Sequence, residues 1–452
     1  MASFTSSQST LSVIMRRNRR QRNTPSARRD EAAGPETEMT VTGIGAQGDG
    51  IACGPDGRVF VPLSVPGDCV RVRLPAGGGE DRAAALIEVL SPGPGRGDPP
   101  CLAFGRCGGC RLQHLSDDAY ARWKVERLTA ALTRAGLSDY RLLPLVRTPP
   151  FARRRANFAA MRRAGGGTEV RLGFTVRSGH EIVDLDVCHV LDPRILAVLP
   201  DLRRFLARFL PPRQRTTVAV AVLDGGLDVV IEWPTTPALD VLEGMSDLAG
   251  EADLARLCWR SSAEALPEPA VQRRPVGAVF GGVFVGVPPG AFLQASREGE
   301  AALIAAVGDA CRPARCIADL FAGIGTFAVP LAAEGARVHA VDADGVALRA
   351  LAAARPDITT ETRNLLARPL SPAELRRFDA VVFDPPRAGA SAQARELARS
   401  EVPLVVAVSC NPDSFARDAT TLGAGGYRLE GVLPVDQFLW SQHLELVALF
   451  RR

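Results

Sequence analysis

Four apolar segments in the last third of the chain constrain the fold more than any other feature of the sequence. They read CIADLFAGIG, ARVHAVDAD, FDAVVFDPP and PLVVAVSCNP. Short continuous apolar runs, separated by helix-like segments, are typical of buried parallel strands in an open α/β sheet. Ligands of such sheets bind beyond the carboxyl ends of the strands. Four polar or reactive side chains fall at those predicted ends, namely Asp319, Asp342, Asp384 and Cys410.

The first of these segments leads into a Gly-x-Gly turn at Gly323 and Gly325, and the second ends at Asp342, 19 positions after Gly323. Glycines let a cofactor approach the backbone, and an acid at the second strand end accepts hydrogen bonds from both ribose hydroxyls. A nicotinamide dinucleotide normally asks for a third glycine, whereas this turn continues with Thr326. The Asp384-Pro385-Pro386 corner instead resembles the substrate side of S-adenosylmethionine-dependent methyltransferases. We therefore expect a C-terminal Rossmann-like domain that binds this cofactor.

Cys410 lies where the fourth apolar segment stops. The stop is expected at Asn411-Pro412, because proline fixes φ and has no N–H. A cysteine in this position is either a small buried side chain or a thiol presented at the edge of the sheet. Its place beside the other strand ends favours the presented thiol. Because a thiolate is the reactive form, we expect the site to lower the pKa of Cys410.

A second group of cysteines lies far from these strands. Cys101, Cys107 and Cys110 have the spacing C-x5-C-x2-C, and Gly108 and Gly109 separate the last two. The candidate for a fourth ligand is Cys188, 78 positions after Cys110. Four thiolates suit both zinc and a [4Fe–4S] cluster, so the spacing leaves the metal open. Three unrelated cysteines are the remaining interpretation.

The chain divides into four regions by composition. Residues 1–38 are rich in Ser, Thr and Arg and predict a disordered arm, although a transit peptide or a start assigned upstream of Met39 would look the same. Residues 39–93 contain short strands with glycine-rich turns and predict an OB-like β-barrel that resembles a TRAM domain, an RNA-binding module. Residues 94–270 predict a central α+β domain with the cysteine site. Residues 271–452 form the α/β domain.

The basic residues are almost all arginine. Lys124 is the only lysine among 54 Lys and Arg residues, and the net charge is +4. The cluster formed by Arg153, Arg154, Arg155, Arg162 and Arg163 is interleaved with phenylalanines and has two interpretations. It either contacts RNA or covers a solvated strand face. No apolar run is long enough to cross a bilayer, so we expect a cytoplasmic monomer without a membrane partner.

Several motifs together resemble one family. PPGAFLQAS, DLFAGIGTFAVPLA, DPPRAGA, VSCNPDSFARD and HLELVALF are similar to the RNA uridine-5 methyltransferases, and the resemblance covers roughly residues 39–452. With CLAFGRCGGC and the barrel, it extends to the branch that carries a TRAM domain and an iron–sulfur cluster. The resemblance implies methylation of uridine C5 in structured RNA by S-adenosylmethionine, with 23S ribosomal RNA favoured over transfer RNA.

The resemblance also implies roles for individual residues. Cys410 would be the nucleophile that adds to uracil C6, and Glu445 the base that removes the C5 proton. The S-adenosylmethionine and uracil pockets would be lined by Gln294, Phe321, Thr326, Asp342, Asn364 and Asp384. A [4Fe–4S] cluster would be held by Cys101, Cys107, Cys110 and Cys188.

Two positions depart from the family pattern. Ala322 replaces a cysteine in the cofactor loop, and Leu439 replaces a proline in the segment before Glu445. Both departures affect the expected choice of substrate more than the expected reaction. The alternatives are methylation of uridine in transfer RNA, methylation of cytosine C5 in RNA, and a non-catalytic RNA-binding protein on a methyltransferase fold. Enzymes of the cytosine type commonly carry a second motif cysteine, and none lies beside Asp384.

Overall fold

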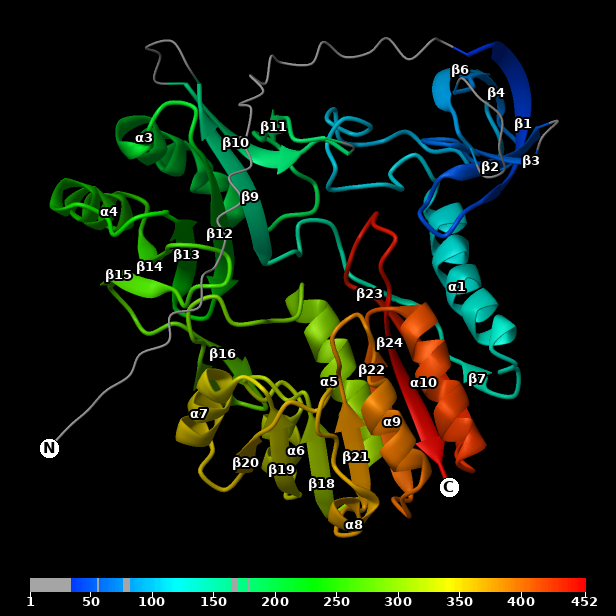
Figure 1. The fold of residues 1–452 in the computed structure, drawn as a ribbon, viewed down its shortest axis with the longest axis vertical. Coiled ribbons are helices and arrows are strands. Elements are labelled where there is room, and N and C mark those ends of the chain that lie inside the picture. The colour runs from blue at the N-terminus through cyan, green and yellow to red at the C-terminus, as the bar shows by residue number, and fades with distance from the viewer. Residues whose placement is uncertain (1–33, 55–56, 76–81, 164–168, 178) are drawn as a thin grey trace, which may run out of the picture.

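The computed structural model describes residues 34–54, 57–75, 82–163, 169–177 and 179–452. Most of the predicted arm lies outside these residues. Its end does not, because strand β1 (Glu36–Ile44) already begins three residues before the expected boundary at Met39. Figure 1 shows an N-terminal lobe and a central lobe side by side, both above a C-terminal lobe. None of the helices in the described ranges combines the length and apolarity needed to span a bilayer.

The N-terminal lobe is one curled sheet. Its strands follow the order β5-β3-β2-β1-β4-β6. Besides β1, they are β2 (Gly50–Gly54), β3 (Gly57–Val61), β4 (Cys69–Arg73), β5 (Arg82–Ala83) and β6 (Ala85–Ser91). The edge strands β5 and β6 are separated in the chain by Ala84 alone, so the sheet must curl until its two edges lie close together. Alternate apolar residues such as Val41, Val59 and Val70 point into its interior and are almost fully buried.

The central lobe is a seven-stranded sheet with helices on one face. The strand order is β11-β10-β9-β12-β13-β14-β15. The strands are β9 (Arg155–Arg162), β10 (Val170–Thr175), β11 (Ile182–Asp184), β12 (Arg215–Leu223), β13 (Gly226–Glu232), β14 (Leu254–Arg260) and β15 (Glu268–Gln272). The helices are α2 (Pro193–Ala197), α3 (Leu199–Phe209) and α4 (Leu239–Glu251), and they share one apolar core with the sheet. The other face is only partly open: Arg256 and Cys258 of β14 are buried, whereas Asn157 of β9 and Arg215 of β12 are exposed.

The C-terminal lobe is the predicted α/β sheet. Its order is β20-β19-β18-β21-β22-β24-β23-β7, and the first five strands are parallel. The eight strands of the sheet are β7 (Arg141–Leu142), β18 (Cys316–Leu320), β19 (Arg337–Asp342), β20 (Thr359–Thr362), β21 (Ala380–Phe383), β22 (Leu404–Ser409), β23 (Arg428–Asp436) and β24 (Glu445–Arg451). The chain moves outward from β18 to β20 and then returns to β21, which creates a switch point between β18 and β21. The mixed α/β fold expected here is confirmed.

Helices cover both faces of this sheet. One face packs against α5 (Arg297–Cys311), α6 (Ala328–Ala333) and α7 (Gly345–Ala354). The other packs against α8 (Pro372–Leu375), α9 (Ser391–Ala398) and α10 (Pro412–Ala424). A short hairpin, β16 (Gly277–Phe280) with β17 (Val283–Gly286), contributes to the first core and connects this lobe to the central one.

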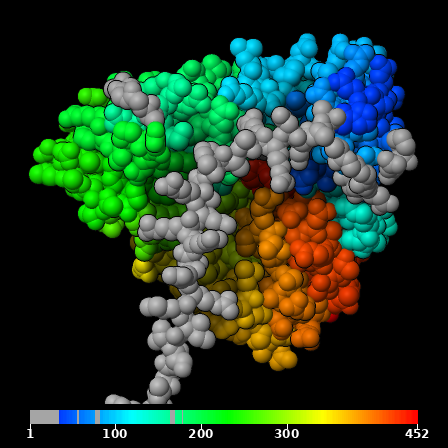
Figure 2. Space-filling view, turned by 45° about the horizontal axis from the view of Figure 1, so that its top comes forward, coloured from blue at the N-terminus to red at the C-terminus, as the bar shows by residue number. Residues whose placement is uncertain are grey.

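One segment assigned by sequence to residues 94–270 packs on the C-terminal lobe instead. Helix α1 (Asp117–Arg134) shares the core of α10, and strands β7 (Arg141–Leu142) and β8 (Val146–Arg147) pair with β23. Helix α1 is amphipathic in sequence, but the sequence does not indicate which sheet covers its apolar face. Figure 2 shows the three lobes meeting around a recess in which dark red surface from near the C-terminus is visible.

Arg154 shows how the central and C-terminal lobes are joined. Its guanidinium is 3 % exposed, forms an ion pair with Glu300 of α5, and donates through Nε to the carbonyl oxygen of Gln294 at 3.0 Å. Its backbone N–H donates to Ala295 O at 2.9 Å. Arg154 is therefore a structural residue, and neither interpretation of the arginine cluster, RNA contact or a solvated strand face, applies to it. A buried guanidinium is tolerated only when a negative charge is paired with it, and Glu300 provides that charge.

The Arg154–Glu300 pair predicts a large stability effect. Glu300→Gln leaves the buried guanidinium without a negative partner, so we expect the free energy of unfolding in urea to fall by about 3–5 kcal/mol. Arg154→Met combined with Glu300→Leu removes both charges and should recover most of that loss. A Glu300→Gln protein as stable as the parent would show that the pair does not join the lobes.

Candidate active site

The turn after β18 has an open space above its backbone. Phe321, Gly323 and Gly325 have φ values of +61°, +54° and +94°. A Cβ at Gly325 would lie 2.5 Å from Leu351 Cδ1, so packing requires glycine there. A Cβ at Gly323 would meet no atom within 4 Å. The left-handed conformation of Phe321 costs of order 1–3 kcal/mol in a non-glycine residue and marks a functional loop. A ligand can therefore approach the backbone at Gly323.

Asp342 holds this turn from the end of β19. Its Oδ2 accepts from Gly323 N and its Oδ1 from Asp344 N, both at 2.8 Å. Its carbonyl accepts from Arg363 N at 2.8 Å, which places Asn364, an exposed residue just beyond β20, at the same edge. Half-buried Thr326 follows Gly325 in the turn. The structure thus brings Phe321, Asp342 and Asn364 to the carboxyl ends of neighbouring strands, as predicted.

Beneath the turn lies a buried acid, Asp319. Its side chain is fully buried, and neither oxygen has a hydrogen-bond partner in ordinary geometry among the described residues. Burial raises its pKa well above the usual range, and the charges of Asp384 and Asp342 raise it further. An unpaired acid under an open turn fits a ligand that carries positive charge, as S-adenosylmethionine does at its sulfonium.

A hydrogen-bonded chain joins two carboxylates across the next part of the edge. Gln294 Nε2 donates to Asp384 Oδ2 at 3.0 Å. Gln437 Nε2 donates both to Gln294 Oε1 at 2.6 Å and to Glu445 Oε2 at 3.0 Å. Gln294, Gln437 and Glu445 are each 2 % exposed. Burial raises the pKa of both carboxyls, and the charge of Asp384 raises that of Glu445 further.

Cys410 lies next to this chain. Ser409 is opposite Leu446 in the β22–β24 ladder, so the residue after Ser409 lies beside the start of β24, where Glu445 is. Asn411 caps α10 through its Oδ1, which accepts from Asp413 N at 3.1 Å, and its Nδ2 donates to Arg387 O at 3.1 Å. The sequence prediction that Cys410, Glu445 and Asp384 belong to one place agrees with this geometry.

The expected lowering of the Cys410 pKa is wrong in this structure. Burial raises the pKa of the thiol to about 12, and the negative charges of Glu445 and Asp384 add to the rise. The guanidinium of Arg387 and a backbone hydrogen bond oppose this rise. A strand end next to two buried carboxylates favours the neutral thiol, so a further positive charge is needed to favour the thiolate.

The segment between β23 and β24 is held by residues that sequence reasoning missed. Lys124 of α1 is fully buried; its Nζ lies 2.8 Å from Asp436 Oδ1 and donates to the carbonyl oxygen of His443. Tyr120 Oη donates to Asp436 Oδ2 at 2.5 Å and accepts from Trp440 N at 2.9 Å. The signal available in the sequence was that Lys124 is the only lysine.

The four predicted cluster ligands share one cavity of about 290 Å³. Its lining contains Cys101, Cys107, Cys110, Cys188, Arg153, Phe438 and His443, among others. Gly109 N lies 3.5 Å from Cys107 Sγ. Burial raises the pKa of Cys107 and Cys188, and raises that of Cys110 to about 12. Even so, no group of three or more His, Cys, Asp or Glu residues in the described ranges is arranged to hold a metal ion.

Comparisons with known sequences agree on one family. The model of the family described as tRNA (uracil-5-)-methyltransferase matches residues 372–452. A protein of Brucella suis named an uncharacterized RNA methyltransferase is 42 % identical over 421 residues, which are 92 % of this chain and 98 % of that protein. The 23S rRNA (uracil(1939)-C(5))-methyltransferase RlmD of Chromohalobacter salexigens is 32 % identical over 448 residues, 94 % of this chain and 91 % of that protein.

A solved structure shares the fold. The tRNA (uracil-54, C5)-methyltransferase of Pyrococcus abyssi, in complex with S-adenosyl-L-homocysteine, superposes with a TM-score of 0.73 at 23 % identity. The superposition covers 91 % of this chain and 99 % of that one. The likeness extends over the described lobes and shows that their arrangement is an established one.

The raised pKa of Cys410 is open to direct measurement. Because the thiol titrates near pH 12, its alkylation by iodoacetamide should accelerate about tenfold for each pH unit between about pH 7 and about pH 10. Burial raises the pKa of Glu445 to about 8, so above that pH Glu445→Gln removes a negative charge that raises the Cys410 pKa, and alkylation of Cys410 should be faster there. Peptide mass spectrometry distinguishes Cys410 from the other cysteines.

The matched control for this experiment is Glu396→Gln, which makes the same charge change in α9, where Glu396 pairs with Arg399 at the surface. It should leave the rate unchanged. A rate that already reaches a plateau near neutral pH would mean that the thiol is acidic and that the electrostatics described above are wrong.

Proposed function

Because the chain belongs to the RNA uracil-5 methyltransferase family and is an S-adenosylmethionine-dependent enzyme, we propose that it methylates C5 of a uridine in 23S ribosomal RNA through a covalent adduct with Cys410. One observation carries this proposal. Cys410, Glu445 and Asp384 gather at the carboxyl edge of the sheet, beside the open turn at Gly323. A nucleophile, a carboxylate base and a cofactor loop within one edge are what the reaction needs.

Cys410 activates the target base. Uracil C5 is too weak a nucleophile to take a methyl group unaided, and addition of the Cys410 thiolate to C6 turns the ring into an enolate with a nucleophilic C5. S-adenosylmethionine, when bound, supplies the electrophilic methyl group. Its positive charge also favours the thiolate at an edge where Glu445 and Asp384 otherwise oppose ionisation.

Glu445 completes the reaction. After methyl transfer, C5 carries both the methyl group and a proton, and Glu445 takes that proton while the C6–S bond breaks and releases Cys410. A carboxylate whose pKa is raised by burial is a stronger base than one in water. Gln437 donates a hydrogen bond to Glu445 Oε2 and so fixes its orientation.

The remaining site residues are assigned to binding. Phe321, Thr326, Asp342 and Asn364 would hold the cofactor, and the carboxylate of Asp342 already faces the turn on which it would lie. Gln294 and Asp384 would bind the uracil edge, because a side-chain amide and a carboxylate together match its donors and acceptors. The target uridine must leave its base stack in the RNA to reach these buried side chains.

The choice of ribosomal RNA rests on the relatives. The relative named for 23S rRNA is 32 % identical and nearly full length, whereas the solved structure named for tRNA is 23 % identical. We further assign residues 36–93 to a TRAM-type RNA-binding barrel, in agreement with the curled sheet. Residues 94–270 are assigned to the central domain and 271–452 to the catalytic domain, except that residues 117–147 pack on the catalytic domain. Transfer RNA is the second candidate.

We also propose that Cys101, Cys107, Cys110 and Cys188 hold a [4Fe–4S] cluster. Support comes from the shared cavity and from the backbone N–H of Gly109, which lies 3.5 Å from Cys107 Sγ. Four protein thiolates leave no open coordination position, so the role is structural. The thiols must lose their protons on assembly, because the thiolate is the ligand.

The covalent route can be tested by separating its two residues. Glu445→Gln keeps the nucleophile but removes the base, so it should accumulate a protein–RNA complex that survives denaturing electrophoresis and contains the labelled methyl group. Cys410→Ala should give neither adduct nor 5-methyluridine, although S-adenosylmethionine still binds. Nucleoside mass spectrometry of 23S rRNA and tRNA transcripts identifies the product and the preferred RNA.

The double variant Cys410→Ala/Glu445→Gln is the matched control, since trapping depends on the thiol and its band should vanish. Near-parental formation of 5-methyluridine by Cys410→Ala would refute the nucleophile assignment. Formation of 5-methylcytidine instead would show that the protein methylates cytosine C5 in RNA.

The cluster proposal predicts about four irons per chain and broad visible absorbance in protein purified without oxygen. Cys110→Ser should lose most of the iron and unfold at a lower temperature, because the metal stabilises the fold that binds it. Cys53→Ser, a change at an exposed cysteine of the N-terminal sheet, should keep both properties. Stoichiometric zinc without iron would overturn the assignment.

A further inference from the structure

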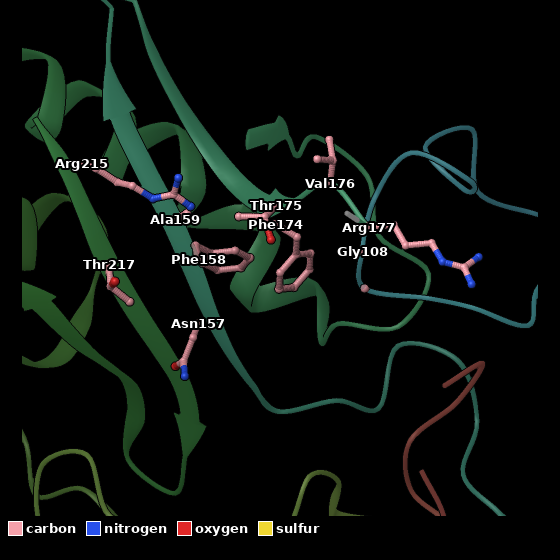
Figure 3. Close-up of a pocket in the computed structure, with 11 residues that line it drawn as sticks. Gly108, Asn157, Phe158, Ala159, Phe174, Thr175, Val176, Arg177, Arg215 and Thr217 are labelled. Carbon is pink, nitrogen blue, oxygen red and sulfur yellow. The ribbon is translucent and has the colours of Figure 1, made fainter. Parts of the chain in front are cut away.

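A second cavity lies on the far side of the cysteine loop from the site described above. It has a volume of about 350 Å³, within the range of pockets that bind small molecules. Figure 3 shows residues from three strands and from the loop that carries Gly108 arranged around it. The residues that matter for its chemistry are Asn157, Phe174, Arg177, Arg215 and Thr217. Neither Cys410 nor Glu445 lines it.

The pocket exists because two strands diverge. Strands β9 and β10 pair only between residues 159–162 and 170–173. Beyond that ladder β10 pairs with β11, while β9 remains paired with β12. The gap between them is bounded by Asn157 and Phe158 on one side and by Phe174 and Thr175 on the other. Gly108 closes it through its hydrogen bond to Thr175 O.

The free groups in this pocket are complementary to a nucleobase. Exposed Asn157 and half-buried Thr217 make no side-chain hydrogen bond to any residue within the described ranges, so an amide and a hydroxyl are available. The ring of Phe174 is half-buried and lies 5.2 Å from that of Phe158, which leaves part of an aromatic surface in the lining. An amide reads the polar edge of a base, and an aromatic ring stacks on its face.

The charges fit a nucleotide better than a free anion. Arg177 is already paired with Asp49 of the N-terminal lobe, so its charge is compensated. Arg215 is exposed, and within the described residues its guanidinium donates from Nη1 to the carbonyl oxygen of His180 at 2.8 Å. One uncompensated guanidinium at the rim, with an aromatic and an amide inside, matches one phosphate and one base.

We propose that this pocket binds an unpaired nucleobase of the RNA other than the target uridine, with Phe174 stacking on it, Asn157 and Thr217 bonding its edge, and Arg215 contacting its phosphate. The inference rests on the proposed function, in that the bound RNA is the methylation substrate. Gly108, Gly109 and Phe174 also line the cysteine cavity, whose other wall includes Ser441 and His443 of the segment before Glu445. The pocket therefore lies across the cysteine loop from the segment before Glu445, close enough for one RNA to contact both.

Two oligonucleotides of equal charge separate base binding from phosphate binding. Oligouridylate and the same backbone lacking its bases are titrated with the protein, and the ratio of their Kd values reports base recognition. Asn157→Ala should weaken oligouridylate binding about 2- to 10-fold without affecting the abasic strand, since it removes one or two hydrogen bonds to a base. Arg215→Ala should weaken both and lower the salt dependence.

Arg208→Ala is the matched control for Arg215, because it removes one exposed arginine from α3, on the covered face of the same sheet. It should leave both affinities unchanged. With 23S rRNA as substrate, Asn157→Ala should raise KM and leave kcat unchanged, since it touches no reacting atom. Photocrosslinking with 4-thiouridine in the oligonucleotide should label the peptide that contains Phe174.

The binding measurements need no turnover, so they remain informative even if the wild-type protein methylates no RNA, which would count against the proposed function alone. Equal losses for both oligonucleotides in Asn157→Ala would show a phosphate subsite and refute base binding. Crosslinks confined to peptides near Cys410, with Asn157→Ala indistinguishable from the parent, would refute the pocket.

Discussion

The active edge depends on a buried ammonium group. Lys124 has three N–H donors, and three acceptors surround it: Asp436 Oδ1, the carbonyl oxygen of His443, and that of Phe438 at 3.5 Å. Burial lowers its pKa and Asp436 opposes that shift, so the charge is retained only through the pair. The segment it holds runs between Gln437 and Glu445, which is the proposed base and accepts a hydrogen bond from Gln437. Arginine has a planar fork and could not donate in these directions.

The same edge disfavours ionisation of Cys410, the proposed nucleophile. Burial and two carboxylates raise the pKa of Cys410, and the same burial raises the pKa of Glu445 and Asp384. A site of this kind keeps the thiol neutral in the absence of a nearby positive charge. Under the proposed function, S-adenosylmethionine would supply that charge at its sulfonium, and ionisation of Cys410 would then depend on the presence of the methyl donor.

The three lobes contribute different parts of one RNA-binding problem. The C-terminal sheet carries the residues proposed to react, the curled N-terminal sheet contacts the central lobe through the Arg177–Asp49 pair, and the central sheet has a pocket between β9 and β10. Arg154 and Glu300 join the central and C-terminal lobes where Gln294 enters the hydrogen-bonded chain. Figure 1 shows the segment before β24 pointing into the region between the lobes. Movement of one lobe would therefore displace the base or its partners.

The sequence by itself determined the strands of the catalytic sheet and the residues at their ends. Asp342, Asp384 and Cys410 follow continuous apolar runs, and parallel strands present their carboxyl ends at one edge, so periodicity alone brought them together. Glu445 came from the resemblance to a family, because nothing local distinguishes an acid at the start of a strand. The glycines at 323 and 325 were also recognisable in the sequence as a Gly-x-Gly turn. Their positive φ values in the structure agree with that interpretation.

Only the tertiary structure decided the rest. Lys124, Gln437 and Gln294 approach one another from distant parts of the chain, and no local pattern encodes such a pairing. Arg154 belongs to an arginine cluster in the sequence, and only the structure shows that it is buried against Glu300. Strand β7 extends the sheet by pairing Arg141 with Gly431, 290 positions later, and α1 packs on the same sheet. The pKa of Cys410 was misjudged for the same reason. Desolvation depends on every atom that surrounds a group, and a sequence specifies those atoms only through the fold.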